Sequence, residues 1–80
     1  MGNTETDVIA LKKILVERRL ERTPALSRAS GVGRTTLSNI LNGRIQPSSE
    51  VIRKLIVALS LSPATAGEIF FSDNLHNVQG

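Results

Sequence analysis

The sequence predicts a compact all-α fold built from five helices. No stretch alternates apolar and polar residues as a half-buried strand would, whereas several stretches repeat apolar residues at helical spacing. Thr23-Pro24 and Ser62-Pro63 are helix start signals, and Gly31 and Gly43 are stop signals. Eighty residues with 40% hydrophobic content suffice for one domain with a single modest core.

The first helix is predicted over residues 7–21, with Thr6 as its N-cap. Its apolar residues recur on one side, which we expect to face the core: Val8, Leu11, Ile14, Leu15, Val16 and Leu20. The second helix follows, and we expect Thr23 to cap it because Pro24 suits the first helical position. It ends near Ser30, where Gly31 supplies the left-handed conformation of a tight turn.

The other three helices follow similar start and stop signals. The third starts after Gly33 and ends at Asn42-Gly43. Ser48 or Ser49 caps the fourth helix. Its predicted core stripe is Val51, Ile52, Leu55, Ile56 and Leu59. Ser62-Pro63 opens a short fifth helix that reaches Phe70 or Phe71. One of these phenylalanines is expected to fill the core and the other to be exposed.

We therefore predict a flexible N-terminus over residues 1–6, a folded domain over residues 7–71, and a flexible, polar tail over residues 72–80. The chain has no cysteine, which removes disulfides and thiolate metal sites and fits a reducing cytosol. It has no apolar run of membrane-spanning length and no secretory signal pattern. We expect a cytoplasmic protein that contacts no membrane.

The basic residues are concentrated in the middle of the chain. All ten Lys and Arg residues lie between Lys12 and Lys54, together with only three of the seven acidic residues. This window carries a formal charge of +7, whereas the whole chain carries +3. A basic centre between acidic ends suggests a polyanionic partner, although Lys and Arg also solvate ordinary helix faces.

The third predicted helix has an unusual exposed face. In SRASGVGRTTLSNILNG, residues 27–43, the apolar residues Leu37, Ile40 and Leu41 share one side. The other side presents Arg34, Thr35, Ser38 and Asn39. A face that served only solubility would favour Glu and Lys, which are stronger helix formers. Short hydroxyl and amide side chains can hydrogen-bond to base edges in the major groove, and an arginine can bind guanine through two hydrogen bonds. The alternative is an ordinary exposed helix face.

Residues from about Leu11 to Phe70 resemble the lambda-repressor and Cro-like (XRE-type) helix-turn-helix family of bacterial and phage regulators. The resemblance rests on an ordered series: Leu26, Gly31-Val32, Leu37-Ser38 with Ile40, Asn42-Gly43, Pro47-Ser48, Leu55 and Ala58-Leu59. It implies that residues 7–71 form a five-helix DNA-binding domain, whose second helix crosses the DNA backbone and whose third helix enters the major groove. It also implies a homodimeric repressor from a bacterium, phage or mobile element, acting on double-stranded DNA in the cytosol or nucleoid.

Roles carry over from the family by position. Arg34, Thr35, Ser38 and Asn39 occupy the base-reading positions. The phosphate-binding positions hold Thr23, Gly33, Asn42, Gly43 (through its amide) and Arg44. Two interpretations stay open for Arg18, Arg19 and Arg28, which either contact DNA or only solvate their helices. Ser27 occupies a position that often holds Ala and is expected to be a small packing residue.

The chain departs from the family pattern at three places. Gly33 stands where the family usually has a capping Ser or Thr. A buried Arg–Glu pair is replaced by apolar residues, Leu41 in one position and Leu15 or Val16 in the other. The link between Leu20 and Leu26 is one residue longer than usual, which weakens the phosphate assignment near Thr23.

We expect no enzymatic activity, no cofactor and no metal site, because the chain shows no nucleophile–base set, paired carboxylates or phosphate loop. A two-fold dimer contact through the fifth helix and the tail, with Phe70 and Phe71, is a hypothesis. One rival function is the DNA-binding antitoxin of a toxin–antitoxin pair, whose C-terminal tail would bind a protein partner. The other is a protein-interaction module on the same scaffold, without DNA binding.

Overall fold

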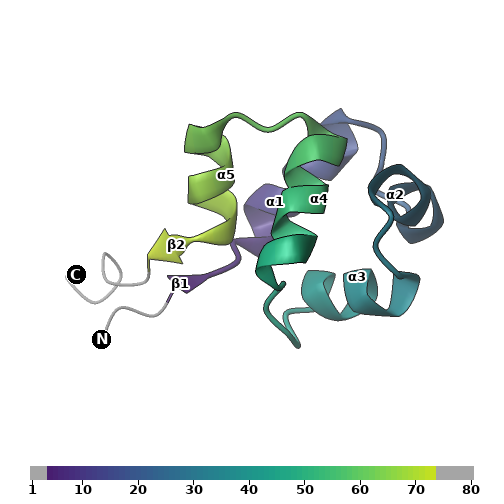
Figure 1. Cartoon of the computed structure of the whole chain (residues 1–80), viewed down its shortest axis with the longest axis horizontal. Coiled ribbons are helices and arrows are strands. Elements are labelled where there is room, and N and C mark those ends of the chain that lie inside the picture. The colour runs from purple at the N-terminus through teal and green to yellow at the C-terminus, as the bar shows by residue number, and fades with distance from the viewer. Residues whose placement is uncertain (1–3, 74–80) are drawn as a thin grey trace.

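Five helices form the protein over the residues that the computed structural model describes, 4–73 (Figure 1). They are α1 (Val8–Glu17), α2 (Thr23–Ser30), α3 (Arg34–Leu41), α4 (Ser49–Leu59) and α5 (Pro63–Phe70). Two short strands, β1 (Thr4–Glu5) and β2 (Ser72–Asp73), flank the helices. The predicted all-α class with five helices is confirmed.

Two predicted N-caps are displaced by one residue. Asp7, rather than Thr6, caps α1, because its Oδ1 accepts a hydrogen bond from the Ala10 amide at 3.0 Å. At the start of α2, Thr23 is the first helical residue and Arg22 takes the extended N-cap conformation, without a side-chain cap. The hydroxyl of Thr23 is therefore not used as the predicted helix cap.

The C-terminal end of α1 is also earlier than predicted. The helix ends at Glu17 rather than Glu21, because Arg19 adopts a left-handed conformation with φ of 59°. The Leu20 amide then donates to the Leu15 carbonyl at 2.8 Å, which closes the helix end. Apolar periodicity continued past this point, and no glycine marks the turn in the sequence.

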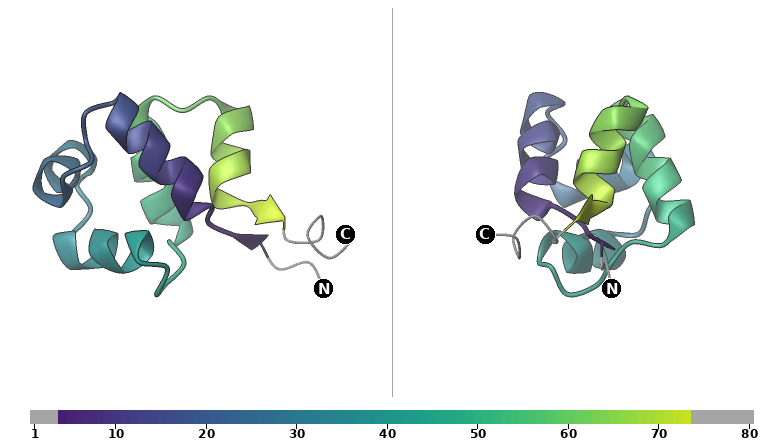
Figure 2. Two further views of the ribbon diagram at one scale, coloured as in Figure 1. Left: turned by 180° about the vertical axis from the view of Figure 1, so that it is seen from behind. Right: turned by 90° about the vertical axis from the view of Figure 1, so that its left-hand side faces the viewer.

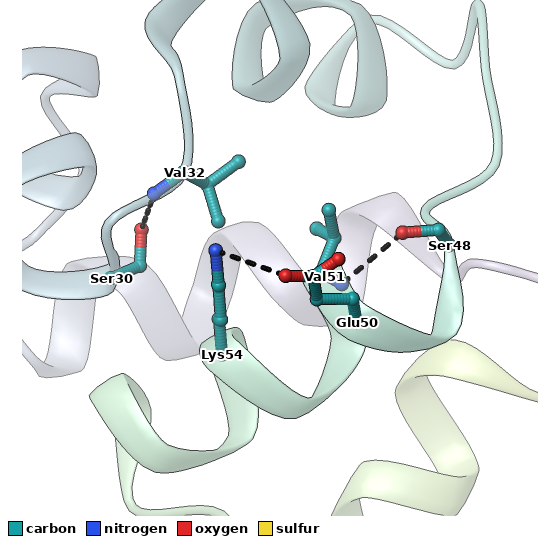
Figure 3. Close-up of polar contacts among 6 residues, drawn as sticks. All are labelled: Ser30, Val32, Ser48, Glu50, Val51 and Lys54. Atoms are coloured by element: carbon teal, nitrogen blue, oxygen red, sulfur yellow. Dashed lines mark hydrogen bonds and ion pairs between the residues drawn. The ribbon is translucent and has the colours of Figure 1, made fainter.

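The starts of α4 and α5 agree with the sequence prediction. The Ser48 hydroxyl accepts a hydrogen bond from the Val51 amide at 3.3 Å (Figure 3), which selects Ser48 over Ser49 as the cap. The Ser62 hydroxyl accepts one from the Thr65 amide at 3.1 Å. Both helices thus begin with a serine that satisfies a first-turn donor.

One apolar core lies between the helices. Its buried residues are Leu11, Leu15, Leu26, Val32, Leu37, Ile40, Ile52, Leu55, Leu59, Leu61, Ala66, Ile69 and Phe70. No polar or charged residue is buried in the described part of the chain. Val16, predicted to face inward, is 59% exposed, because it lies one residue and about 100° beyond buried Leu15. Leu15 and half-buried Leu41 both pack in this core.

The chain segments at the two ends of the domain meet in a small antiparallel ladder. Thr4 pairs with Asp73, and Glu5 pairs with Ser72. Figures 1 and 2 show the ladder beside α5, at the far end of the long axis from α2. Strands of two residues have no periodicity to detect, and their pairing is non-local, so the sequence did not predict them.

The proposed limits of the flexible ends stay predictions. Residues 1–3 and 74–80 of those ends lie outside the described residues, and the latter hold most of the tail assigned to a possible protein partner. Within residues 4–73, no helix has the length and apolar character that a membrane crossing requires.

Candidate nucleic-acid interface

A tight turn joins α2 to α3, and two serines brace it. Gly31 adopts the predicted left-handed conformation, with φ of 78°. The Ser27 hydroxyl donates to the Val32 carbonyl at 2.6 Å. The Ser30 hydroxyl donates to the Leu26 carbonyl at 2.7 Å and accepts from the Val32 amide at 3.2 Å (Figure 3). These contacts hold α3 in a defined position relative to α2.

Ser27 therefore does more than the packing that the sequence suggested. Its half-buried hydroxyl links the last turn of α2 to the residue that leads into α3, and Val32 itself is buried. A serine where the family often has alanine was the signal that could have revealed this role, because a hydroxyl near a turn commonly bonds the backbone.

The exposed face of α3 is the one that the sequence predicted. Leu37 and Ile40 are 1% exposed and anchor the helix to the core. Arg34, Thr35 and Ser38 are exposed on the other side. Asn39 is half-buried at the edge of this face. The core contacts thus orient four hydrogen-bonding side chains away from the body of the protein.

A hollow of about 450 Å³ opens between the start of α2 and the exposed side of α3. It is lined by Thr23, Arg34, Thr35, Ser38, Asn39 and Arg44, and we call it the reading hollow. All four predicted base-reading residues lie here, with two of the five predicted phosphate-binding residues. Helical spacing places the four base-reading residues on one face of α3. Thr23 lines the same hollow because α2 packs beside α3, and Arg44 does so because the chain turns after the end of α3.

The other three predicted phosphate-binding residues lie outside this hollow. Gly33 is exposed at the N-cap of α3, in an extended conformation. Asn42 is exposed at the C-cap, and its Nδ2 donates to the Ser38 hydroxyl at 3.4 Å. The Gly43 amide, which we expected to hold a phosphate, already donates to the Ile40 carbonyl at 3.0 Å. Gly43 instead contributes a left-handed φ of 73°, which turns the chain toward Arg44.

Helices α2 and α3 differ from the other three at their N-termini. Asp7, Ser48 and Ser62 cap α1, α4 and α5, whereas no side chain caps α2 or α3. No acid lies in the first turn of α2 or α3. First-turn N–H groups of these two helices can therefore donate to an external acceptor, and the helix dipole favours an anion there.

The arginines of the reading hollow are not neutralised within the described residues. The ion pairs in residues 4–73 lie elsewhere, between Glu17 and Arg18 at 3.7 Å and between Glu50 and Lys54 at 3.5 Å (Figure 3). No acid lines the hollow. Two exposed guanidinium groups beside hydroxyl and amide groups form a surface that suits phosphates and base edges.

Arg18 takes a structural role at another place. Its Nε donates to the Leu59 carbonyl at 2.8 Å, which joins the end of α1 to the end of α4. A cation there also complements the C-terminal dipole of α4. This contact is neither of the two roles left open for Arg18, which were DNA contact and solvation of its helix. Arg19 and Arg28 are exposed and do not line the hollow.

The two phenylalanines have opposite environments. Phe70 is 3% exposed and packs in the core, so its side chain is not available for the dimer contact that we expected of it. Phe71 is 51% exposed directly after α5. Only Phe71 keeps the interface role proposed for the pair.

Comparison with known proteins agrees with the geometry. A helix-turn-helix family model of the XRE and lambda-repressor-like type matches residues 11–65, which is most of the chain and includes α2, the turn and α3. No curated protein and no solved structure matches the chain. With two thirds of its length under that model, the chain belongs to the lambda-repressor-like helix-turn-helix family of DNA-binding transcriptional regulators.

Proposed function

We propose that this protein binds a specific sequence of double-stranded DNA and represses transcription by occupying an operator. The observation that carries the proposal is the reading hollow, where the exposed face of α3 meets Thr23 and Arg44 without an acid. A cationic surface rich in hydrogen-bonding side chains complements both phosphates and base edges. Occupation of the operator would block transcription sterically, in a bacterial cytosol or nucleoid.

In this proposal α3 lies in the major groove and its exposed face contacts the base edges. Arg34 is suited to guanine, whose O6 and N7 accept two hydrogen bonds from one guanidinium group. Asn39 is suited to adenine, which offers a donor and an acceptor to an amide. Thr35 and Ser38 can donate or accept, so their preferred bases depend on register.

Phosphates would be held on the rims of the groove. Thr23 offers its hydroxyl beside the uncapped start of α2, and Gly33 exposes the uncapped start of α3. Asn42 and Arg44 would contact the backbone beyond the C-terminal end of α3. Such contacts set the register of the protein on DNA, whereas the base contacts set its sequence preference.

A homodimer is the proposed binding unit. The exposed side chain of Phe71 supports the end of α5 as the contact, because exposed aromatic residues are enriched at interfaces. The two copies of α3 would then lie about 34 Å apart, one turn of DNA, and would require an inverted-repeat operator.

Selection of preferred sites from a random duplex pool tests this function. The proposal expects an enriched inverted repeat whose half-sites lie one helical turn apart. It also expects the logarithm of affinity to fall linearly with the logarithm of salt concentration. A pool without enrichment, together with no salt-dependent duplex binding, would contradict DNA binding and favour the protein-interaction module. Co-purification of a second protein from the native host would favour the antitoxin.

A further inference from the structure

The link between α3 and α4, residues 42–48, carries Arg44 into the reading hollow. It is attached at its two ends: the Arg44 amide donates to the Asn39 carbonyl at 2.8 Å, and Ser48 caps α4. Its middle residues, Ile45 and Gln46, are exposed, so the core does not hold them. A polar contact also holds the middle of this link, at Gln46.

That contact joins Gln46 to Thr6, forty positions earlier in the sequence. The Gln46 Oε1 accepts two hydrogen bonds from Thr6, one from its amide at 3.0 Å and one from its hydroxyl at 3.1 Å. Thr6 is itself held in place, because it follows β1 in the terminal ladder and the next amide, of Asp7, donates to the Ile69 carbonyl at 2.6 Å. The link is thus fastened to a segment that α5 supports.

The link also separates two hollows. Arg44 lines the reading hollow, whereas its neighbour Gly43 lines a second hollow of about 520 Å³, with Ile45, Gln46 and Thr6. The link thus lies between two surface hollows, and Ile45 and Gln46 on it are exposed. The Thr6–Gln46 contact therefore restrains the link on the far side of Arg44, in addition to the bond between the Arg44 amide and the Asn39 carbonyl.

We propose that Gln46 is a positioning residue for DNA binding, which acts by holding Arg44 where a phosphate would meet it. This inference rests on the proposed function. Its physical basis is pre-organisation: a link held before DNA arrives loses less conformational entropy when Arg44 binds a phosphate. Substitution of Gln46 would change the affinity for all DNA sequences alike. Gln46 acts through Arg44, which would contact a phosphate of the DNA backbone rather than a base.

Gln46→Met tests the proposal, because it keeps the length of an exposed side chain and removes the carbonyl oxygen. Loss of the contact is expected to weaken binding about three- to tenfold on specific and random duplexes alike, the scale of one or two hydrogen bonds. Arg44→Ala is expected to weaken binding on all sequences and to lower the salt slope by about one. In the Arg44→Ala background, Gln46→Met should then have no further effect.

Thr6 and Arg53 provide the controls. Thr6→Val should weaken binding in the same direction as Gln46→Met, and Thr6→Ser should restore it, since serine keeps the hydroxyl. Arg53→Ala removes an exposed arginine of α4 that does not line the reading hollow, and it should change affinity less than Arg44→Ala. Thermal unfolding of each variant is measured in parallel, so that binding is compared between folded proteins.

The outcomes distinguish the positioning role of Gln46 from the proposed function, DNA binding. If the wild-type protein does not bind duplex DNA, the proposed function is wrong. If the wild type binds and Arg44→Ala weakens it, but Gln46→Met binds normally, the positioning role is overturned and the proposed function stands. The role is also overturned if Gln46→Met remains harmful without Arg44 while Thr6→Val is harmless, since Gln46 would then contact DNA itself.

Discussion

At the scale of single residues, Asn39 and Ile40 are neighbours on α3 with different environments. Its neighbour Ile40 is 1% exposed and fixes the helix to the core, while Asn39 is half-buried at the rim of the reading hollow. A partly enclosed amide has fewer rotamers to lose than a fully exposed one, so its orientation costs less on binding.

Asn39→Ala should relax the preference for one base pair of the selected site. The loss of a two-point contact with adenine is expected to cost about 1–3 kcal/mol at that position and little elsewhere. Binding to the selected site and to its single-pair variants measures this cost. Asn42→Ala is the matched control, because it should weaken binding equally on every sequence. An unchanged site preference after Asn39→Ala would contradict the groove assignment.

Ser27 illustrates a single hydroxyl that fixes a relation between two helices. Ser27→Ala should lower the free energy of unfolding by about 1 kcal/mol, because the Val32 carbonyl loses its donor. Denaturant unfolding of the variant measures the change, with exposed Ser49→Ala as the control. Equal stability of both variants and the wild type would show that solvent replaces the Ser27 contact.

At the scale of elements, the ends of helices decide how the faces are presented. A left-handed residue follows each of the helices α1 to α4 within two positions, and only two of these four residues are glycines. Gly31 and Gly43 flank α3, whereas Arg19 and Ser60 take positive φ values of 59° and 54° after α1 and α4. The two glycine turns thus lie on either side of α3.

Arg19→Gly should stabilise the protein for this reason. A residue with a Cβ costs about 1–2 kcal/mol in the left-handed conformation, and glycine avoids this cost. Glycine also loses more backbone entropy on folding, which cancels about half of that gain. We expect a net gain of about 0.5–1 kcal/mol in the free energy of unfolding. Arg19→Ala is the control, because it removes the charge and keeps the Cβ. A variant no more stable than Arg19→Ala would show that the turn carries no strain.

At the scale of the whole molecule, the reading hollow and the terminal ladder occupy different regions. Figure 1 places β1 and β2 beside α5, whereas α2 and α3 lie toward the other end of the long axis. A contact between copies near the end of α5 would leave both reading faces accessible. This separation is what a two-fold complex on an inverted repeat requires.

Phe71→Asp should convert the proposed dimer to a monomer. A carboxylate buried at a two-fold contact loses its hydration and lies close to the same carboxylate of the partner copy. Sedimentation of the wild type and the variant measures mass directly. Val57→Asp, at a side chain 78% exposed on α4, is the control and should leave the mass unchanged. The same mass for wild type and Phe71→Asp would remove α5 as the contact.

Elements were predictable where the determinants were local. The spacing of Leu37, Ile40 and Leu41 sufficed to identify the exposed face of α3, and serines before a proline or an acid sufficed for the starts of α4 and α5. The end of α1 was not predictable, because Arg19 adopts a conformation that its residue type disfavours. Val16 was wrongly predicted to face inward. Periodicity identifies the apolar side of a helix, but it does not show which edge of that side packs against another helix.

By itself, the sequence determined the five helices, the turn at Gly31 and the set of side chains on the exposed face of α3, since these depend on residues within a few positions of one another. Only the tertiary structure decided that Thr23 and Arg44 join that face, that Phe70 rather than Phe71 fills the core, and that Gln46 is fastened to Thr6. The approach of Thr23 to α3 and the contact of Thr6 with Gln46 link positions far apart in the chain. Their geometry follows from how the helices pack, which no local pattern of residues encodes.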